Sequence, residues 1–277
     1  MKISVVTISF NQAPFLERAI RSVLEQDHRD VEFIVVDAGS TDGSREIIGR
    51  YRDRFARVIL EPDEGPADGL NKGFAHATGD ILAYINADDA LISGALGEAA
   101  SEFASHPEMD LIYGHGYLVD GEDRQLRRLR SAPFDLWRAV HGSSVIVQQA
   151  TFIRRQAFHD VRGFNAANRS CWDYELLVDL ALAGKRFHRV DRYWGVFRLY
   201  PNSLTGSMRH REALRRDFAR IYEKATGRPK GWCFAPMAAA ARLSKWIVDP
   251  VSLAISISDS ARLELGLARG KSLSTSG

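Results

Sequence analysis

Two adjacent carboxylates, Asp88 and Asp89, follow a short apolar run that begins after Gly79 and ends at Asn86. A run of this length is typical of a strand buried on both faces of a sheet. In open α/β sheets, ligands bind outside the carboxyl ends of the strands, so we expect both carboxylates at the rim of a crevice. They repel each other, and a cation such as Mg²⁺ or Mn²⁺ relieves that repulsion. The alternative is a solvated turn, with these residues as turn formers.

Three further aspartates stand where the same chemistry could use them. Asp37 ends a second apolar run, and Asp68 begins a helical segment, each in or near a polar loop that follows a strand. Asp173 stands in the first turn of a later helix, where the helix dipole favours a carboxylate and the side chain can point into a pocket. We therefore expect several of these carboxylates at one edge of a sheet.

The elements that must position these side chains alternate in type over the first part of the chain. The pattern predicts strands at 2–8, 31–36, 58–60 and 80–86, with helices at 14–26, 44–54 and 67–77 between them. This alternation is typical of a parallel sheet. The predicted fold class is therefore α/β, with a Rossmann-like, mostly parallel sheet flanked by helices.

The alternation becomes less regular after Asp89. Helices are expected at 93–105 and 171–184, and strands are expected at 110–113, 116–119, 146–153, 187–190 and 193–199. The last part of the chain reads as basic and helical, with helices at 209–226 and 236–257, the second interrupted at Pro250. We expect one domain over 1–205 and a C-terminal helical extension over 206–277.

Composition narrows the class of protein. The 277 residues carry a net charge of only +2, which gives no reason to expect a nucleic-acid partner. Cys171 and Cys233 are too few for a disulfide framework and lack metal-site spacing, which favours a reducing compartment such as the cytoplasm. No run approaches the ~20 apolar residues that a membrane-spanning helix needs.

Several short motifs, taken in order, make a more specific signal. They are Val-Val-Thr-Ile-Ser-Phe-Asn at 5–11, Val-Val-Asp-Ala-Gly-Ser-Thr-Asp-Gly-Ser at 35–44, Asp-Glu-Gly-Pro-Ala-Asp-Gly-Leu-Asn-Lys-Gly at 63–73, Asn-Ala-Asp-Asp at 86–89 and Trp-Asp-Tyr-Glu at 172–175. Over residues 1–205 the chain resembles the family 2 glycosyltransferases of bacterial polysaccharides and cell-surface glycans. The resemblance implies a GT-A fold, a nucleotide-binding half at 1–90, an acceptor-binding half at 91–205, and an inverting reaction that uses a nucleotide diphosphate sugar.

The resemblance assigns side chains of the first half to the donor. Asp37 can accept the imide N–H of a uracil or thymine ring, which points to a UDP- or dTDP-linked sugar. Asp88 and Asp89 resemble the region that binds a divalent cation, and Mg²⁺ or Mn²⁺ is the expected cofactor. The implied donor set is Thr7, Ser9, Asn11, Asp37, Asp68, Lys72, Asn86 and Asp88.

Two of these assignments compete with purely structural roles. Asp37 could instead cap its own loop over Ser40 or Thr41. Asp68 and Lys72 are four residues apart on a helix, so they could form a surface ion pair that contributes little to stability.

The resemblance makes Asp173 the general base, which takes the proton of the acceptor hydroxyl on the face opposite the leaving diphosphate. The alternative role of Asp173 is a plain carboxylate at a helix N-terminus. Glu175 is nearby, but on a helix it would point about 200° away from Asp173. Gln149 and Trp172 are expected in the acceptor or sugar pocket, with a polar edge strand and core packing as their alternatives.

The predicted cation site departs from the family pattern at two positions. Asn86 stands where many relatives carry an aspartate, which keeps an oxygen ligand but loses a charge. Relatives often carry a histidine in an Arg-x-His context, whereas this chain has Arg198-Leu199-Tyr200. A third protein ligand is therefore in doubt, and His210 is only a distant substitute.

The expected acceptor is a saccharide or a lipid-linked saccharide. Basic and aromatic residues of the extension suit a helix resting on an anionic membrane, at the inner face of the cytoplasmic membrane, and a helical cap or a homodimer contact explains them equally well. Two other functions stay open. One is a catalytically silent nucleotide-binding or scaffold protein of the same fold. The other is a metal-dependent nucleotidyltransferase, which would normally have a glycine-rich phosphate loop where residues 9–12 have none.

Overall fold

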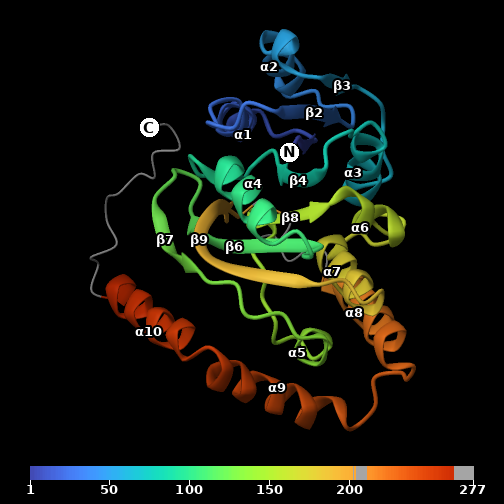
Figure 1. The fold of residues 1–277 in the computed structure, drawn as a ribbon, viewed down its shortest axis with the longest axis vertical. Helices are drawn as coiled ribbons and strands as arrows, with labels where there is room; N and C mark the ends of the chain where they lie inside the picture. The colour runs from blue at the N-terminus through green and yellow to red at the C-terminus, as the bar shows by residue number, and fades with distance from the viewer. Residues whose placement is uncertain (202, 204–210, 265–277) are drawn as a thin grey trace.

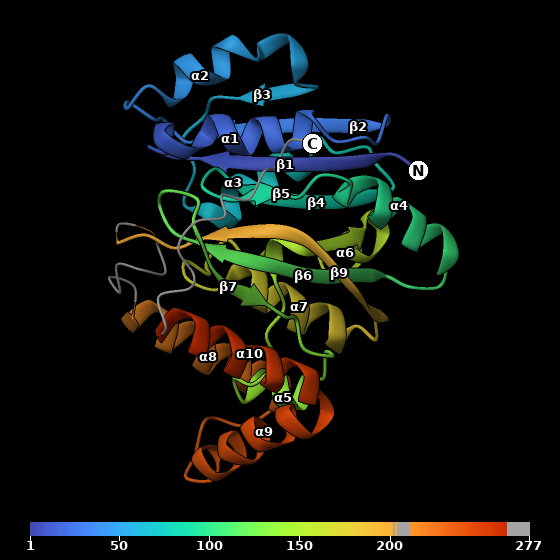
Figure 2. The same cartoon turned by 90° about the vertical axis from the view of Figure 1, so that its left-hand side faces the viewer.

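The computed structural model describes residues 1–201, 203 and 211–264 of the chain. Within these residues one mixed sheet of nine strands runs through the molecule, in the order β3-β2-β1-β4-β8-β6-β9-β5, and β7 pairs with β6 (Figure 1). Helices cover both faces of the sheet. The C-terminal helices lie at the opposite end of the molecule from β2 and β3 (Figure 2).

The first half of the sheet is purely parallel. Its strands are β1 (Ile3–Ser9), β2 (Val31–Asp37), β3 (Arg57–Ile59) and β4 (Ile81–Asn86), and its helices are α1 (Ala13–Leu24), α2 (Ser44–Arg50), the 3-10 turn η1 (Arg52–Arg54) and α3 (Pro66–Phe74). β1 pairs in parallel with β2 and β4, and β2 pairs in parallel with β3. A proline stands in the first turn of α1 and of α3, where its missing N–H and fixed φ suit helix initiation.

The second half mixes both strand directions. Its strands are β5 (Ala90–Leu91), β6 (Leu111–Val119), β7 (Gln125–Leu129), β8 (Thr151–Arg154) and β9 (Phe187–Arg198). Its helices are α4 (Ala95–Ser105), α5 (Leu136–Val140), the 3-10 turn η2 (Gln148–Ala150), α6 (Arg155–Asp160) and α7 (Trp172–Leu182). β8 runs antiparallel between β4 and β6, whereas β6 and β9 are parallel. The predicted α/β class is confirmed, and parallel pairing is confined to β1–β4 and to β6 with β9.

Two pairs of predicted short strands are in fact single long strands. The segments 110–113 and 116–119 join into β6, and the segments 187–190 and 193–199 join into β9. Close approach between β6 and β9 explains the glycines of β6. A Cβ on Gly114 would lie 2.6 Å from the carbonyl oxygen of Arg192, and one on Gly116 would lie 2.7 Å from that of Gly195. These glycines therefore let β6 and β9 pack closely instead of ending the strand.

Two other sequence-based expectations need correction. The strand predicted at 146–153 begins only at Thr151, because the chain before it turns through η2. The basic run at 124–130, for which the sequence predicted no strand, contains β7; among the described strands β7 pairs only with β6 and so forms an edge of the sheet. Arginine side chains are compatible with an edge strand because at least one of its faces reaches solvent.

Two apolar layers enclose the sheet. One layer, against α1, α2 and α4, contains the buried side chains of alternate strand residues such as Val5, Val35 and Ile85. The other, against α3, α6 and α7, contains the intervening residues such as Val6 and Tyr84. This alternation follows from the two-residue period of a strand, and it decides which helix each site residue faces.

The described part of the C-terminal region forms α8 (Arg211–Thr226), α9 (Phe234–Val248) and α10 (Pro250–Glu264). Arg220 of α8 pairs with Glu175 of α7, and Asp259 of α10 accepts hydrogen bonds from Arg128 of β7 at 2.8 Å. A domain boundary near residue 205 stays a prediction. None of the described helices combines the length and apolar character that crossing a bilayer requires.

Candidate functional site

The carboxyl ends of β1, β2 and β4 form one edge of the sheet and carry most of the predicted donor set. Ser9 pairs with Asp37, and Ile8 pairs with Asn86. Because paired residues of parallel strands point to the same face, Thr7, Ser9 and Asp37 share the face of α1 and α2. Asn86 points to the opposite face, toward α3 and α7. The edge therefore has two sides with different side chains.

Asp89 is anchored by segments that are remote in sequence. Its side chain is buried, and its Oδ2 accepts hydrogen bonds from the amides of Gln149 at 2.7 Å and Asn86 at 3.0 Å. Its Oδ1 accepts one from the backbone N–H of Arg198 at 3.1 Å. Burial and the neighbouring Asp88 carboxylate raise the pKa of Asp89 to about 8. Asp89 thus joins β4, η2 and β9 through neutral N–H donors.

Asp88 faces Tyr200. The Tyr200 hydroxyl lies 3.1 Å from Oδ2 of Asp88 and 3.0 Å from Oε1 of Gln12, and its single proton can serve one of them at a time. Burial raises the pKa of Asp88. Tyr200 therefore stands beside the acidic pair at the position where the family pattern has a histidine, while His210 lies outside the described residues.

Arg198 fixes the backbone of this rim from inside the protein. Its side chain is 1% exposed and its guanidinium donates to the carbonyl oxygens of Asp88 and Asp120, each at 2.9 Å. It also pairs with Asp123 and lies 4.7 Å from the centre of the Phe15 ring. Because a buried charge is costly without partners, this set of contacts makes Arg198 a structural part of the site.

Asp37 is held by its own loop. Its carboxylate accepts hydrogen bonds from the Ser40 backbone at 2.9 Å, the Ser40 hydroxyl at 2.5 Å and the Arg45 side chain at 2.8 Å. Burial alone would raise the pKa of Asp37, but these hydrogen bonds bring it below its ordinary value. Asn11, in the left-handed region at φ 53°, accepts from the backbone of Thr41 at 2.9 Å. The loop cap given as an alternative is therefore present.

Three buried polar atoms of the edge have no hydrogen-bond partner within the described part of the chain. They are Oγ1 of Thr7, Oγ of Ser9 and Oδ1 of Asn86. Buried polar atoms in folded proteins are nearly always satisfied, so atoms of this kind mark places where a ligand can bind. The Asn86 oxygen also suits a hard divalent cation, which prefers oxygen ligands.

Asp68 and Lys72 form the ion pair that their spacing allows. The Lys72 ammonium lies 2.9 Å from Oδ2 of Asp68 and donates to the carbonyl oxygen of Pro62 at 2.6 Å. Asp68 also accepts the backbone N–H of Glu64 at 3.0 Å. Both side chains therefore order the loop that leads into α3 and stay partly exposed.

Asp173 lies beside the other face of β4. It is the second residue of α7, and its charge is close enough to Tyr84 to add to the effect of burial in raising the pKa of that phenol. Burial raises the pKa of Asp173 itself, against the opposing effect of the backbone N–H groups at the helix start. Tyr84 is two residues before Asn86 on β4, so Asp173 and the acidic rim lie near each other.

Glu175 has a structural role, which differs from the role predicted for Asp173. It is fully buried and accepts hydrogen bonds from Asn168 and from Arg220 of α8, each at 2.8 Å. Burial acts to raise the pKa of Glu175, but these donors lower it to about 2. Glu175 therefore fixes the start of α7 to α8 as a permanently charged anchor.

The two residues predicted for the acceptor pocket are both buried. Gln149 uses its amide to bind Asp89 and is 6% exposed. Trp172 is 8% exposed and packs in the core layer that contains Tyr84 and Phe164, which is its alternative role. Sequence reasoning assigned no role to Gln12 or Arg198. The only sequence signal for Gln12 was its place directly after the first motif, at 5–11. The only signal for Arg198 was its place in Arg198-Leu199-Tyr200, where relatives have the Arg-x-His pattern.

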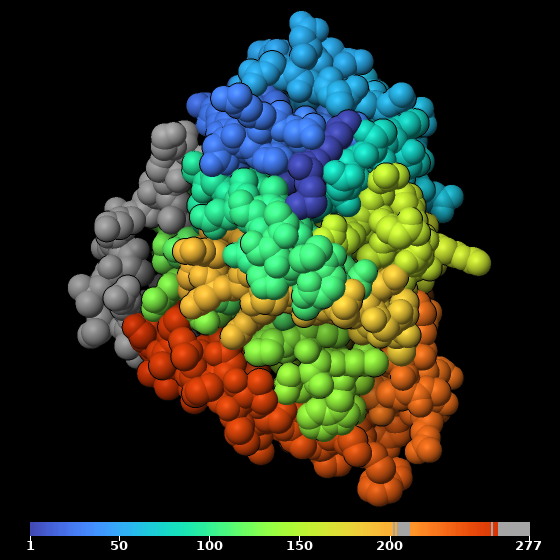
Figure 3. All heavy atoms as spheres, viewed as in Figure 1, coloured from blue at the N-terminus to red at the C-terminus, as the bar shows by residue number. Residues whose placement is uncertain are grey.

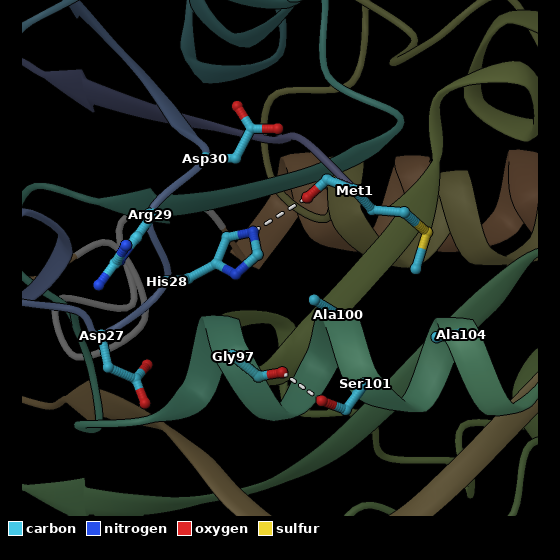
Figure 4. A pocket seen from close by; sticks show the side chains of 9 residues that line it. All are labelled: Met1, Asp27, His28, Arg29, Asp30, Gly97, Ala100, Ser101 and Ala104. Atoms are coloured by element: carbon cyan, nitrogen blue, oxygen red, sulfur yellow. Dashed lines mark hydrogen bonds between the residues drawn. The ribbon is translucent and has the colours of Figure 1, made fainter.

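A cavity of about 600 Å³ lies away from this edge, where β1 begins. It is lined by His28, Asp30 and Met1 on one side and by Gly97, Ala100, Ser101 and Ala104 of α4 on the other (Figure 4). The predicted site residues do not line it. The cavity is therefore separate from the candidate site.

Solved structures with this arrangement identify the class of fold. The chain is similar to Staphylococcus aureus TarS in complex with UDP, with a TM-score of 0.64 and 20% identity over 89% of this chain and 72% of that chain. It is also similar to the mannosyltransferase PcManGT of Pyrobaculum calidifontis in complex with GDP-Man and Mn²⁺, with a TM-score of 0.62 and 20% identity over 98% and 76% of the two chains. The fold is of the GT-A type.

Sequence comparison then identifies the family. The model of glycosyl transferase family 2 matches residues 4–174. An uncharacterized glycosyltransferase of Nostoc is 36% identical over 129 residues, which are 46% of this chain and 40% of that protein. An uncharacterized glycosyltransferase of Mycobacterium tuberculosis is 32% identical over 65% of this chain and 69% of that protein. The PGL/p-HBAD biosynthesis glycosyltransferase of the same species is 28% identical over 77% and 82%.

The chain therefore belongs to glycosyl transferase family 2, and the expected family, GT-A fold and transferase class are confirmed. It spans about 40% of the length of the Nostoc relative, so the activity, substrates and partners of this protein remain matters for proposal.

Proposed function

We propose that the protein is an inverting glycosyltransferase, which moves a sugar from a nucleotide diphosphate sugar to a saccharide or a lipid-linked saccharide. The observation that carries the proposal is the position of Asp173. This half-buried carboxylate, whose pKa is raised, lies in the first turn of α7 beside β4, and the end of β4 leads to Asn86 and Asp88. A proton acceptor next to a donor-binding rim is the arrangement that displacement with inversion requires.

In the proposed reaction the acceptor hydroxyl oxygen attacks the anomeric carbon as the bond from that carbon to the diphosphate breaks. Asp173 takes the hydroxyl proton, and its raised pKa makes it a better proton acceptor than an ordinary carboxylate. The nucleoside diphosphate leaves on the opposite face of the sugar. The partial desolvation that raises the pKa of Asp173 also strengthens its electrostatic effect on the developing charges.

The residues of the rim fit a divalent cation. Asp88 and the free Oδ1 of Asn86 offer oxygen atoms, as Mg²⁺ and Mn²⁺ prefer. Both Asp89 oxygens already accept N–H groups, so we assign the cation to Asp88 first and give Asp89 the role of holding the rim. When bound, the cation would stabilise the charge of the leaving diphosphate. The Mn²⁺ in the P. calidifontis mannosyltransferase supports a divalent cofactor.

The donor base is proposed to lie against the α1 and α2 side of the edge. There, the unpartnered hydroxyls of Thr7 and Ser9 stand next to Asp37, whose charged state is favoured. A carboxylate acceptor suits uracil or thymine, which favours a UDP- or dTDP-linked donor, and one of the similar structures, the TarS complex, holds UDP.

We propose that the acceptor is bound in a membrane. The supporting observation is that large apolar side chains are exposed on α9 and on the segment before it. Trp232, Leu243 and Ile247 are 89%, 68% and 80% exposed. Arginine and lysine residues of the same region would face the anionic headgroups beside these apolar side chains. A homodimer contact would cover the same surface. Binding of the protein to anionic vesicles would support the membrane contact, whereas self-association in analytical sedimentation would support the homodimer.

Replacement of the base tests the proposed chemistry. Asp173→Asn should lower turnover by about 10²–10⁴-fold while leaving the affinity for UDP nearly unchanged, because only the proton acceptor is lost. Asp179→Asn on the same helix is the matched control and should retain turnover.

The donor and the cation used in this test are found first by a thermal-shift screen of nucleotide sugars with and without Mn²⁺. Full turnover by Asp173→Asn would contradict the proposal, and binding without transfer or hydrolysis in the parent protein would favour the silent alternative.

A further inference from the structure

Three potential metal ligands converge far from the donor edge, on the outer side of α4. Glu102 is on the last turn of α4, His106 follows that helix directly, and His188 is the second residue of β9. One ligand atom from each side chain lies within 4.8 Å of the others. Nδ1 of His106 is 3.5 Å from Oε2 of Glu102, and the two imidazole rings are stacked with their centres 4.2 Å apart.

Both sides of this cluster are rigidly held. On β9, His188 pairs with Ile112 of β6 in the interior of the sheet. On the helix side, the His106 backbone N–H donates to the carbonyl oxygen of Glu102 at 2.9 Å. The Arg154 guanidinium fixes the chain on both sides of His106 by donating to the carbonyl oxygens of Phe103, Pro107 and Met109. The ligands are therefore presented by ordered backbone, as a binding site requires.

The geometry points to a site for a transition-metal ion such as Zn²⁺, which we propose is bound by Glu102, His106 and His188 and connects α4 to β9. Two imidazoles and a carboxylate form a ligand set that suits Zn²⁺, with water as the fourth ligand, whereas Mg²⁺ prefers oxygen ligands alone. Ligands of a tetrahedral Zn²⁺ at ~2.1 Å lie roughly 3.4 Å apart. All three side chains are partly exposed, so rotation of their torsion angles can bring the atoms this close.

The position of the cluster separates it from the cation proposed for the donor. His188 is near the start of β9, and Arg198, which contacts the donor rim, ends the same strand. Ten residues of strand span roughly 30 Å. In Figure 3, α4 and β9 lie side by side on one face of the molecule. Because the three side chains of the cluster are partly exposed, we expect an ion to reach them from solvent.

Zinc titration of the full chain, expressed without a polyhistidine tag and freed of metal by a chelator, tests the site. Isothermal titration with ZnCl₂ in the absence of nucleotide sugar should show one site, and the bound ion should raise the melting temperature of the parent protein. His188→Ala and Glu102→Gln should each weaken this binding by about tenfold or more, since each removes a ligand.

Two controls make the result specific. His76→Ala removes an exposed histidine outside the cluster and should leave the zinc affinity unchanged. Asp88→Asn removes the ligand proposed for the donor cation and should also leave it unchanged, and circular dichroism checks that every variant is folded. The proposal is overturned if the parent protein shows no zinc site, or if His188→Ala and Glu102→Gln bind zinc as tightly as His76→Ala. Should His188→Ala fail to fold, Glu102→Gln decides alone.

Discussion

The loop after β2 and the turn after β4 lie at the same edge of the sheet, and each presents a buried aspartate. At the first, Asp37 is surrounded by donors of its own loop, among them the Arg45 cation, and its pKa is lowered. At the second, Asp89 accepts three hydrogen bonds from neutral groups, next to the carboxylate of Asp88, and its pKa is raised to about 8. Burial acts to raise the pKa of both carboxyls; hydrogen bonds outweigh this effect at Asp37, whereas the second carboxylate adds to it at Asp89.

This difference indicates what each segment can do without a ligand. The β2 loop is complete by itself and holds a negative charge ready for a hydrogen-bond donor such as a nucleobase N–H. The β4 turn holds two carboxylates that resist ionisation together, so it gains stability when a cation arrives. The comparison therefore predicts that the two aspartates affect stability in opposite ways, which mutations can test.

The largest expected effect is at Arg198, which supports the β4 turn. Arg198→Ala should reduce the free energy of unfolding by about 3–5 kcal/mol, because it leaves two carbonyl oxygens without their buried donor and Asp123 without one of its two arginine partners. Urea denaturation measures this change. Arg192→Ala on the same strand is the control, since its side chain is 64% exposed and a surface arginine contributes little. Equal losses in both variants would show that Arg198 does not support the rim.

The two aspartates should show opposite pH dependence. A carboxyl whose folded pKa is raised favours folding below its unfolded pKa of about 4, and that contribution is lost as the pH rises toward about 8. Asp89→Asn should therefore cost least near pH 8 and most near pH 5. A carboxyl with a lowered pKa contributes above pH 4 and loses that contribution in acid, so Asp37→Asn should cost most near pH 7.

Urea denaturation of both variants and the parent protein, from about pH 2 to 8 in buffer with a chelator, measures these costs. Each unit of pKa difference corresponds to about 1.4 kcal/mol. Parallel pH curves for the two variants would mean that the contrast between the loops does not exist in solution.

Tyr200 offers a way to change the β4 turn without disturbing the β2 loop. Tyr200→His should tighten Mn²⁺ binding by on the order of tenfold, because it places an imidazole ligand next to Asp88. Isothermal titration with MnCl₂ in the presence of UDP measures this. Tyr200→Phe is the control, since it loses the hydroxyl without adding a ligand. If the histidine variant binds Mn²⁺ no better than the phenylalanine variant, the cation does not sit beside Asp88.

The smallest expected effect is in the β2 loop. Ser40→Ala removes the hydroxyl that donates to Asp37 at 2.5 Å and accepts from the backbone of Asn11 at 2.8 Å. The loss should be about 1 kcal/mol in the free energy of unfolding, as for other buried hydrogen bonds. Ser101→Ala, in which an exposed hydroxyl of α4 is lost, should change it by less. A Ser40→Ala protein as stable as Ser101→Ala would show that the loop needs no cap.

The sequence was sufficient to predict the β2 loop because its interactions are local. All donors to Asp37 come from within eight residues, so an Asx-type cap could be named as an alternative role from the sequence alone. The strand-helix alternation of the first half was equally clear, because each element there is bounded by turn residues or a proline.

The β4 turn could not be predicted in the same way. Gln149 is 60 residues and Arg198 is 109 residues from Asp89, and no local pattern shows that these side chains meet. The same limit explains why β7 was not predicted, because the sequence does not show which strand pairs with it. The continuity of β6 could not be predicted for the same reason, because its partner β9 is also far along the chain.

The contact between Tyr200 and Gln12 joins residues that are 188 positions apart. During synthesis the ribosome must therefore release the first 200 of the 277 residues before the rim can close, although β1 to β4 can pair much earlier. Such non-local closure is slow compared with helix or hairpin formation. A nascent chain stalled before β9 should hold a folded nucleotide half whose acidic turn is still open, which makes this stage the one most exposed to misfolding and to chaperone capture.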